Sequence, residues 1–240
     1  MDNITLVCVG WNQRKALELM LKSYVFNHFY GGVLKAIIVD NGSTDGSKEW
    51  LVENEIPFIS LNGNIGHEQA INYIYPLIKT KYALIVDTDI EFLRNVYGEY
   101  MHLLNDETKL IGDYIIGDQL NAPVKPRVGA WFYLFDIEAM RGHGVNTFRD
   151  SSDWSYDVCS WMTEKILQHG YKIHHVPRLN EDIDHELISM QYPTHNHIGK
   201  VSWDISKHMD RESEVLRRRQ YIELRVNDYA DIDLKGKFTL

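Results

Sequence analysis

The sequence predicts an α/β fold in which helices flank a mostly parallel central sheet. Three observations predict it. Short apolar segments alternate with helical segments over about the first 90 residues. The apolar segments end in polar, loop-forming residues. The chain, at 240 residues, is also long enough to bury a core without disulfides. Right-handed crossovers between parallel strands follow from this alternation.

The first two strands and the helix between them are predicted from apolar patterning. Residues 4–9 form a short apolar run rich in β-branched residues, which predicts a strand. Residues 14–29 repeat apolar side chains every three or four positions, which predicts a helix, and Gly31 and Gly32 end it. Residues 35–40 predict a second strand that is buried on both faces.

Two further strands complete the first half. Residues 41–47 predict a turn that opens a helix, and residues 57–61 predict a third strand. Residues 66–80 predict a helix with one apolar face. Residues 82–86 predict a fourth apolar strand, which continues directly into an Asp-Thr-Asp sequence at residues 87–89.

The second half of the chain is less regular. Residues 111–118 and 128–135 predict strands, and residues 156–169 predict an amphipathic helix. Residues 170–177 predict a helix stop followed by a strand, and residues 213–226 predict a charged helix.

Charge and composition exclude several classes of protein. The sum of 25 Lys and Arg against 34 Asp and Glu gives a net charge of −9, which disfavours binding to nucleic acid or to anionic lipid. An anionic substrate is still compatible with this negative charge, because a divalent metal can bridge carboxylates to a phosphate. The two cysteines, Cys8 and Cys159, are far apart and predict no disulfide framework, so we expect a reducing cytoplasm. No window approaches the roughly 18 apolar residues of a membrane span.

The polar ends of the four predicted strands define a ligand site. In a parallel sheet, ligands bind beyond the carboxyl ends of the strands. Four polar ends that converge on one edge predict a crevice large enough for a nucleotide. These ends are Trp11-Asn12, Asp40-Asn41, Asn62-Gly63-Asn64 and Asp87-Thr88-Asp89.

The pair Asp87 and Asp89 predicts a cation. Two carboxylates at positions i and i+2 after an apolar strand are costly to place together unless a cation lies between them. A hard divalent cation accepts oxygen ligands and keeps positions open for a substrate phosphate. The alternative is a solvated acidic turn.

Asp40 is a candidate for nucleotide recognition. At the end of the second strand, its carboxylate can accept hydrogen bonds from a base N–H or a ribose hydroxyl. Ser43, Thr44 or Asp45 can cap the following helix. The alternative is that the whole segment is only a turn and a cap, which these residue types form readily.

Taken together, these motifs resemble one family. Residues 39–47 (VDNGSTDGS), residues 62–66 (NGNIG) and residues 86–89 (VDTD), in this order, closely resemble the family 2 glycosyltransferases of GT-A fold. The opening residues 7–12 (VCVGWN) resemble the family's first strand and nucleotide loop. The resemblance is strong over residues 4–92 and continues more weakly to about residue 202.

The resemblance implies a fold and a division of the chain. It implies a Rossmann-like GT-A domain over residues 1–203 with a short C-terminal helical extension over residues 204–240. Within the domain, residues 1–92 would form the nucleotide-sugar-binding half and residues 93–203 the acceptor-binding half.

The resemblance also implies an activity. It implies a metal-dependent, inverting glycosyltransferase that moves a sugar from a nucleoside diphosphate sugar, expected to be a UDP-sugar, to a hydroxyl of a saccharide or glycoconjugate. Mn²⁺, or else Mg²⁺, would be the cofactor. A nucleotidyltransferase and a non-catalytic nucleotide-sugar-binding module are the alternatives. A nucleotidyltransferase normally has a glycine-rich, Lys/Arg-bearing loop after the first strand, and residues 10–14 (GWNQR) fit such a loop poorly, which disfavours the first. The intact acidic residues disfavour the second.

Residue roles follow from the same resemblance. Donor-binding roles fall on the ends of the first four strands, and metal binding falls on the acidic pair with a late histidine. The nucleotide-sugar-binding residues would be Val9, Gly10, Trp11, Asp40, Asn64, Gly66, Asp87 and Thr88, and the metal ligands would be Asp89, Asp87 and His197, with His195 as the alternative.

The resemblance places the catalytic base at Asp157, with Asp153 as the alternative. Asp157 lies at the start of a predicted helix that is followed by a Gly-Tyr-Lys-Ile sequence at residues 170–173, and the acidic residue that acts as the family's catalytic base lies at the same place. Tyr156 replaces the Glu that the family usually has before it. An inverting transfer needs one carboxylate to remove the acceptor hydroxyl proton. The alternative role for Asp157 is that of a helix N-terminal acid.

Arginine and tryptophan side chains complete the candidates. The run of arginines at residues 217–219 lies in a nearly neutral segment, which favours a solvated helix face over a membrane anchor. Closure of one of these arginines over the donor diphosphate is a further alternative. Trp131, Trp154 and Trp161 are candidates for an acceptor-stacking platform, with core packing as the alternative.

Overall fold

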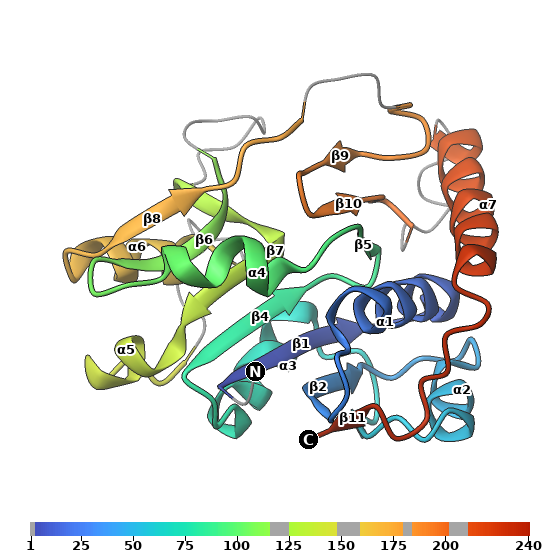
Figure 1. Cartoon of the computed structure of the whole chain (residues 1–240), viewed down its shortest axis with the longest axis horizontal. Helices are drawn as coiled ribbons and strands as arrows, with labels where there is room; N and C mark the ends of the chain where they lie inside the picture. The colour runs from blue at the N-terminus through green and yellow to red at the C-terminus, as the bar shows by residue number, and fades with distance from the viewer. Residues whose placement is uncertain (1–2, 116–124, 148–158, 180–183, 202–210) are drawn as a thin grey trace.

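The central sheet of the protein has the predicted α/β topology. The computed structural model describes residues 3–115, 125–147, 159–179, 184–201 and 211–240 (Figure 1). Within these residues the strand order is β11-β2-β1-β4-β7-β6-β8, and β3 pairs with β2. The strands are β1 (Ile4–Gly10), β2 (Leu34–Asp40), β3 (Phe58–Ser60), β4 (Tyr82–Val86), β6 (Thr108–Ile115), β7 (Arg127–Asp136), β8 (Lys172–His175) and β11 (Phe238–Thr239).

The first-half strands are all parallel to one another. β1 pairs in parallel with both β2 and β4, so that Gly10 lies beside Asp40 and Cys8 lies beside Val86. β7 is antiparallel to β4 and to β6. The carboxyl ends of β1, β2 and β4 therefore meet at one edge, as the sequence predicts.

Helices cover both faces of the sheet. On one face, α1 (Arg14–His28), α2 (Ser47–Glu53) and α4 (Val96–Tyr100) contribute to a core with Leu6, Ile38 and Leu84 of the strands. On the other face, α3 (His67–Ile74), α5 (Ile137–Gly142) and α6 (Ser160–Gln168) pack on alternate strand residues such as Val7 and Ile85. Burial of strand residues on both faces is the reason that these strands read as continuous apolar runs.

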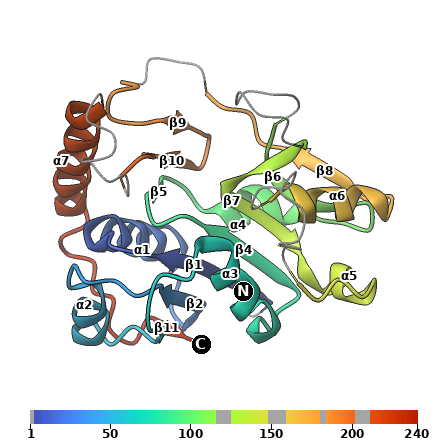
Figure 2. The ribbon, with the colours of Figure 1, turned by 180° about the vertical axis from the view of Figure 1, so that it is seen from behind.

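A second, small sheet and one long helix lie beside this three-layered unit (Figure 2). β10 (His195–His197) lies between β5 (Ile90–Phe92) and β9 (Met190–Gln191), and all pairs are antiparallel. Helix α7 (Glu212–Asp228) packs against the outer side of α1 through a separate apolar cluster. Among the described residues, no helix combines the length and the apolar character that a membrane crossing requires.

Some elements differ from the sequence prediction. The helix predicted over residues 66–80 ends at Ile74 and continues as a 3₁₀ turn, η1 (Tyr75–Leu77), because Pro76 lacks the N–H that an α-helix needs. The sequence did not predict β5, α4, α5 or the short 3₁₀ turn η2 (Met101–Leu103). The charged helix predicted over residues 213–226 is confirmed as α7, and it is one or two residues longer at each end.

Candidate functional site

A cavity opens at the carboxyl ends of β1, β2 and β4. Its volume is about 330 Å³, which is the size class of small-molecule sites. The predicted strand ends and the Asp-Thr-Asp sequence supply most of its wall. The lining residues are Val9, Gly10, Trp11, Gln13, Asn41, Asn64, His67, Asp87, Thr88, Asp89 and Ala130.

Two loops of the cavity wall are locked together by backbone contact. Gly42 has φ +79°, and a Cβ added there would lie 2.5 Å from the Cα of Gly63, so only glycine allows this approach. Beside it, the side chain of Asn41 donates to Asn64 Oδ1 at 3.0 Å and accepts from the Ile65 N–H at 3.1 Å. The loop after β2 therefore fixes the position of Asn64 in the wall.

Asp40 and Gly66 lie beside the cavity, outside its lining. Asp40 is 3% exposed, accepts long hydrogen bonds of 3.3 Å from the Ser43 N–H, and lies 3.6 Å from Lys48 Nζ. Asp40 lines a narrow crevice next to the main cavity, and Gly10 and Trp11 line both. The Gly66 N–H donates to Asn64 Oδ1 at 2.9 Å.

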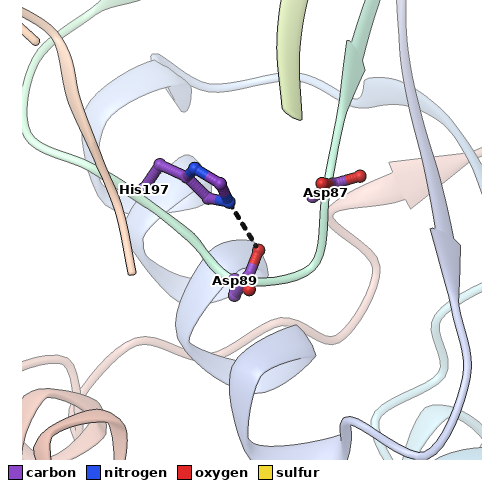
Figure 3. A group of neighbouring side chains, drawn as sticks. All are labelled: Asp87, Asp89 and His197. Carbon is purple, nitrogen blue, oxygen red and sulfur yellow. Dashed lines mark ion pairs between the residues drawn. The ribbon is translucent and has the colours of Figure 1, made fainter. Parts of the chain in front are cut away.

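The structure brings together the three residues for which the sequence predicted metal binding. One ligand atom from each of Asp87, Asp89 and His197 lies within 4.8 Å of the others. His197 Nε2 is 3.5 Å from Asp89 Oδ1, and Figure 3 shows the imidazole directed at that carboxylate. Asp87 and Asp89 follow β4, whereas His197 is carried by β10 from the second half of the chain.

The environment of Asp87 favours a cation. Burial, with a smaller contribution from the charge of Asp89, raises the pKa of the Asp87 carboxyl, while His67 and His197 oppose this rise. His67 Nε2 lies 3.8 Å from Asp87 Oδ1 and has no hydrogen-bond partner among the described residues. A raised carboxylate pKa means that the ionised form lacks a counter-charge, which a bound cation would supply.

The donor set fits a divalent metal ion. Metal–oxygen bonds of about 2.0–2.6 Å let two ligand atoms of one ion lie up to about 5 Å apart. The atoms of Asp87, Asp89 and His197 meet this limit. Two carboxylates with one imidazole suit Mn²⁺ or Mg²⁺, with the imidazole favouring Mn²⁺.

The imidazole of His197 packs on an indole that a chain of hydrogen bonds holds in place. The ring of His197 stacks on the indole of Trp131, with ring centroids 5.1 Å apart. Trp131 Nε1–H donates to the Tyr192 hydroxyl at 3.0 Å, and that hydroxyl donates to Asp113 Oδ2 at 2.8 Å. Arg178 Nε donates to the same carboxylate oxygen at 2.7 Å. The indole of Trp131 is therefore held within the protein by stacking and by a hydrogen bond.

His195, the alternative ligand, lies in a different environment. Its ring lies between Phe132 and Tyr192, with ring centroids 3.9 and 4.5 Å away. Burial lowers the pKa of His195 well below its ordinary value, so the ring is neutral. His195 is not part of the group that Asp87, Asp89 and His197 form.

Other candidates lie away from the cavity or outside the described residues. Asp157, Asp153 and Trp154 fall in the range 148–158, outside the described residues. Trp161 packs on the core of α6, with Lys165 Nζ 5.4 Å from its ring centroid. The three consecutive arginines contact the segment 185–201: Arg217 pairs with Glu186, Arg218 binds the carbonyls of Ile198 and Gly199, and Arg219 binds the carbonyl of Val201.

Sequence reasoning missed several lining residues. Gln13, His67 and Ala130 line the cavity without having been predicted as site residues. His67 directly follows Gly66 of the NGNIG motif (residues 62–66) and begins α3, and that position was a usable signal. Ala130 comes from β7, which only the tertiary fold brings to this edge.

Two solved structures show the class of the fold. A mannosyltransferase from Pyrobaculum calidifontis, solved with GDP-Man and Mn²⁺, has a TM-score of 0.57 at 16% identity, over 73% of this chain and 55% of that one. TarS residues 1–349 from S. aureus, solved with UDP-GlcNAc, has a TM-score of 0.55 at 12% identity, over 96% and 73%. The fold is that of the GT-A glycosyltransferases.

The chain belongs to glycosyl transferase family 2, whose family model matches residues 8–156. A curated relative, the teichoic acid poly(glycerol phosphate) polymerase of Staphylococcus epidermidis, is 28% identical over 117 residues. That match covers 46% of this chain and 16% of the polymerase, so the chain matches only a small part of that relative's length.

Proposed function

We propose that the chain transfers a sugar from a nucleoside diphosphate sugar to an acceptor hydroxyl, with inversion at the anomeric carbon and with a divalent metal bound. The observation that carries this proposal is the group of Asp87, Asp89 and His197, of which the two aspartates line the strand-end cavity. A UDP-sugar is the proposed donor, and a saccharide or glycoconjugate is the proposed acceptor.

Similar structures support the donor and the metal. The mannosyltransferase was solved with GDP-Man and Mn²⁺, and TarS was solved with UDP-GlcNAc. Both ligands are nucleoside diphosphate sugars. The cavity of about 330 Å³ in this chain lies beyond the carboxyl ends of parallel strands, where ligands bind in open α/β sheets.

The donor-binding residues have distinct proposed tasks. The backbone of Val9, Gly10 and Trp11 would line the base, and Asp40 would accept a hydrogen bond from it in the crevice that it shares with Trp11. Asn64, Gly66 and Thr88 would lie near the ribose and the diphosphate. Asp87 would contact the ribose or the metal.

Asp89 and His197 would hold the metal, with Asp87 as the third ligand. A bound divalent ion neutralises the negative charge that grows on the leaving diphosphate. The carboxylates supply charge, and the stacked ring of His197 supplies a ligand of fixed orientation. Mn²⁺ is the proposed ion, with Mg²⁺ as the alternative.

Asp157 is the proposed catalytic base, with Asp153 as the alternative. Its carboxylate would remove the acceptor hydroxyl proton as that oxygen attacks the anomeric carbon. The glycosyltransferase domain would cover residues 1–203, and the C-terminal extension that follows it supplies both α7 and the edge strand β11 of the central sheet. We propose a cytoplasmic location, since a reducing compartment suits Cys8 and Cys159, which are buried and far apart in the sequence.

Incubation with a panel of UDP-, GDP- and dTDP-sugars tests this proposal. We expect release of the nucleoside diphosphate from at least one donor with Mn²⁺ and not with EDTA. NMR of the product should show an anomeric configuration opposite to that of the donor. Metal-independent turnover or retention of configuration would contradict the proposal.

A further inference from the structure

A buried carboxylate lies two residues beyond Asp89. Glu91 of β5 is fully buried at 0% exposure. Its Oε1 accepts hydrogen bonds from Arg225 Nε at 2.8 Å and from the Tyr229 hydroxyl at 3.2 Å. Asn196 of β10 donates to the other oxygen at 3.2 Å. A buried charge is tolerated only when it is paired and hydrogen-bonded, so Arg225 and Tyr229 tie the C-terminal region to β5.

Helix α7 makes a second attachment, directly after His197. Arg218 is 1% exposed, and its Nη1 donates to the carbonyl oxygens of Ile198 and Gly199. Gly199 has φ +71°, and a Cβ there would lie 2.7 Å from Ser189 Oγ, which itself accepts from Arg218 at 2.8 Å. The turn that follows His197 is thus built around the Arg218 guanidinium.

The two attachments share one face of α7. Arg218 and Arg225 are seven residues apart, which is roughly two helical turns. The two segments that these arginines contact are also hydrogen-bonded to each other, since the Ile198 N–H donates to the Asp89 carbonyl at 3.0 Å. Figures 1 and 2 both show α7 beside β5 and β10. One helix therefore contacts β5, which directly follows Asp89, and the turn that directly follows His197.

We propose that Arg225 is a positioning residue for the metal site. By neutralising Glu91 it holds β5 at the separation from β10 that lets Asp89 and His197 share one cation, and Arg218 holds the β10 side. This inference rests on the proposed metal-dependent function. Without Arg225, the buried charge of Glu91 is uncompensated, and the strand shifts or admits water to solvate it. Metal affinity depends on such supporting contacts.

Mn²⁺ titration of the whole chain tests this role, with free Mn²⁺ followed by electron paramagnetic resonance in the presence of UDP. Arg225→Met should bind Mn²⁺ about tenfold or more weakly than the parent chain. Arg225→Lys, which keeps the charge, should recover part of the loss. Asp228→Asn removes the exposed partner of the same arginine and should leave Mn²⁺ affinity unchanged.

A stability control separates positioning from general destabilisation. Met140→Ala leaves a cavity in the core under α5, on the opposite face of the sheet from α1. It should lower the melting temperature in EDTA without weakening Mn²⁺ binding. The double variant Glu91→Gln/Arg225→Met leaves no unpaired charge and carries the same test if Arg225→Met does not fold. It should still bind Mn²⁺ more weakly than the parent, because the hydrogen bonds between Arg225 and Glu91 that tie α7 to β5 are lost.

Two failures are distinguishable. If the parent binds Mn²⁺ and Arg225→Met binds it equally well, or if Met140→Ala weakens binding as much, the positioning role is overturned while the proposed function stands. If the parent does not bind Mn²⁺ in the presence of UDP, the proposed function is contradicted, and the positioning role is overturned with it.

Discussion

The imidazole of His197 and the indole of Trp131 lie almost parallel, with centroids 5.1 Å apart and an interplanar angle of 9°. The carbonyl of the same tryptophan accepts a hydrogen bond from the Asp87 N–H at 3.0 Å. Trp131 therefore contacts two of the three candidate metal ligands, one through its ring and one through its backbone. Only the ring contact can be removed by substitution.

Removal of the Trp131 ring should weaken metal binding. Trp131→Ala frees the His197 ring to rotate, and we expect about a tenfold loss of Mn²⁺ affinity by calorimetric titration with UDP present. Trp131→Phe keeps a stacking ring and loses only the hydrogen bond to Tyr192, so its affinity should lie between the two. Trp161→Ala on α6 controls for loss of an indole elsewhere. Parent-like affinity in Trp131→Ala would show that stacking does not orient His197.

The contact between Gly42 and Gly63 should be sensitive to a single methyl group. Gly42→Ala combines a left-handed backbone with a Cβ 2.5 Å from the Gly63 Cα. Gly31→Ala is a matched control, since Gly31 has φ +83° with no atom within 4 Å of the added Cβ. We expect Gly31→Ala to cost about 1 kcal/mol of the free energy of unfolding. Gly42→Ala should cost at least about 2 kcal/mol more.

Urea unfolding of both variants measures these costs, and UDP titration measures their effect on the site. Gly42→Ala should also weaken UDP binding, because the two loops position Asn64. Equal unfolding free energies for the two variants would show that the loops separate without cost.

Folding stability should fall in acid because of His28. Its Nδ1–H donates to the Tyr24 carbonyl at 2.8 Å and its Nε2 accepts from the Val96 N–H at 2.9 Å, so both nitrogens serve the neutral ring. Burial lowers the pKa of His28 from 6.5 to about 4. The unfolded chain therefore takes up a proton first, and stability present above pH 6.5 is lost as the pH falls towards 4.

This loss attributable to His28 should reach about 2 kcal/mol by pH 5 and about 3 kcal/mol at pH 4. We would measure urea unfolding of the parent and of His28→Gln at several pH values. Their difference separates the loss of stability due to His28 from the loss due to the titration of carboxylates. The difference between the two chains should shrink as the pH falls. His102→Gln, at an exposed position, should follow the parent. A constant difference between the parent and His28→Gln would refute the role given to His28.

Asp157→Asn should abolish transfer while donor binding persists. Loss of a general base typically lowers turnover by about 100-fold or more, whereas the nucleotide contacts lie on other residues. Steady-state turnover with the active donor, together with UDP titration, separates the two effects. Asp153→Asn is the matched control and should keep most of the activity. The reverse pattern would assign the base to Asp153.

The strand ends of the first half were predictable from the sequence because each is a local pattern. Residues 4–9, 35–40 and 82–86 are apolar runs that stop at polar residues, and parallel pairing then brings Trp11 and Asp87 to one edge. The motif resemblance added His197, whose approach to Asp89 depends on the antiparallel pairing of β10 with β5.

The supporting residues were not predictable, because their partners are distant in the chain. Glu91 and Arg225 are 134 positions apart, and nothing near Glu91 indicates that it is buried. The motif resemblance ranked His197 before His195, but residues two apart share a strand face, so strand geometry by itself could not separate the two. Their aromatic neighbours, which come from other segments, distinguish them.

The most direct test of the metal site is Mn²⁺ binding by Asp89→Asn in the presence of UDP, followed by electron paramagnetic resonance. Asparagine keeps the shape of the side chain and removes the charge. We expect the parent to bind one Mn²⁺ per chain and Asp89→Asn to bind it at least about tenfold more weakly. His197→Ala should show a smaller loss. Equal Mn²⁺ affinity in the parent and Asp89→Asn would contradict a metal site at Asp87, Asp89 and His197.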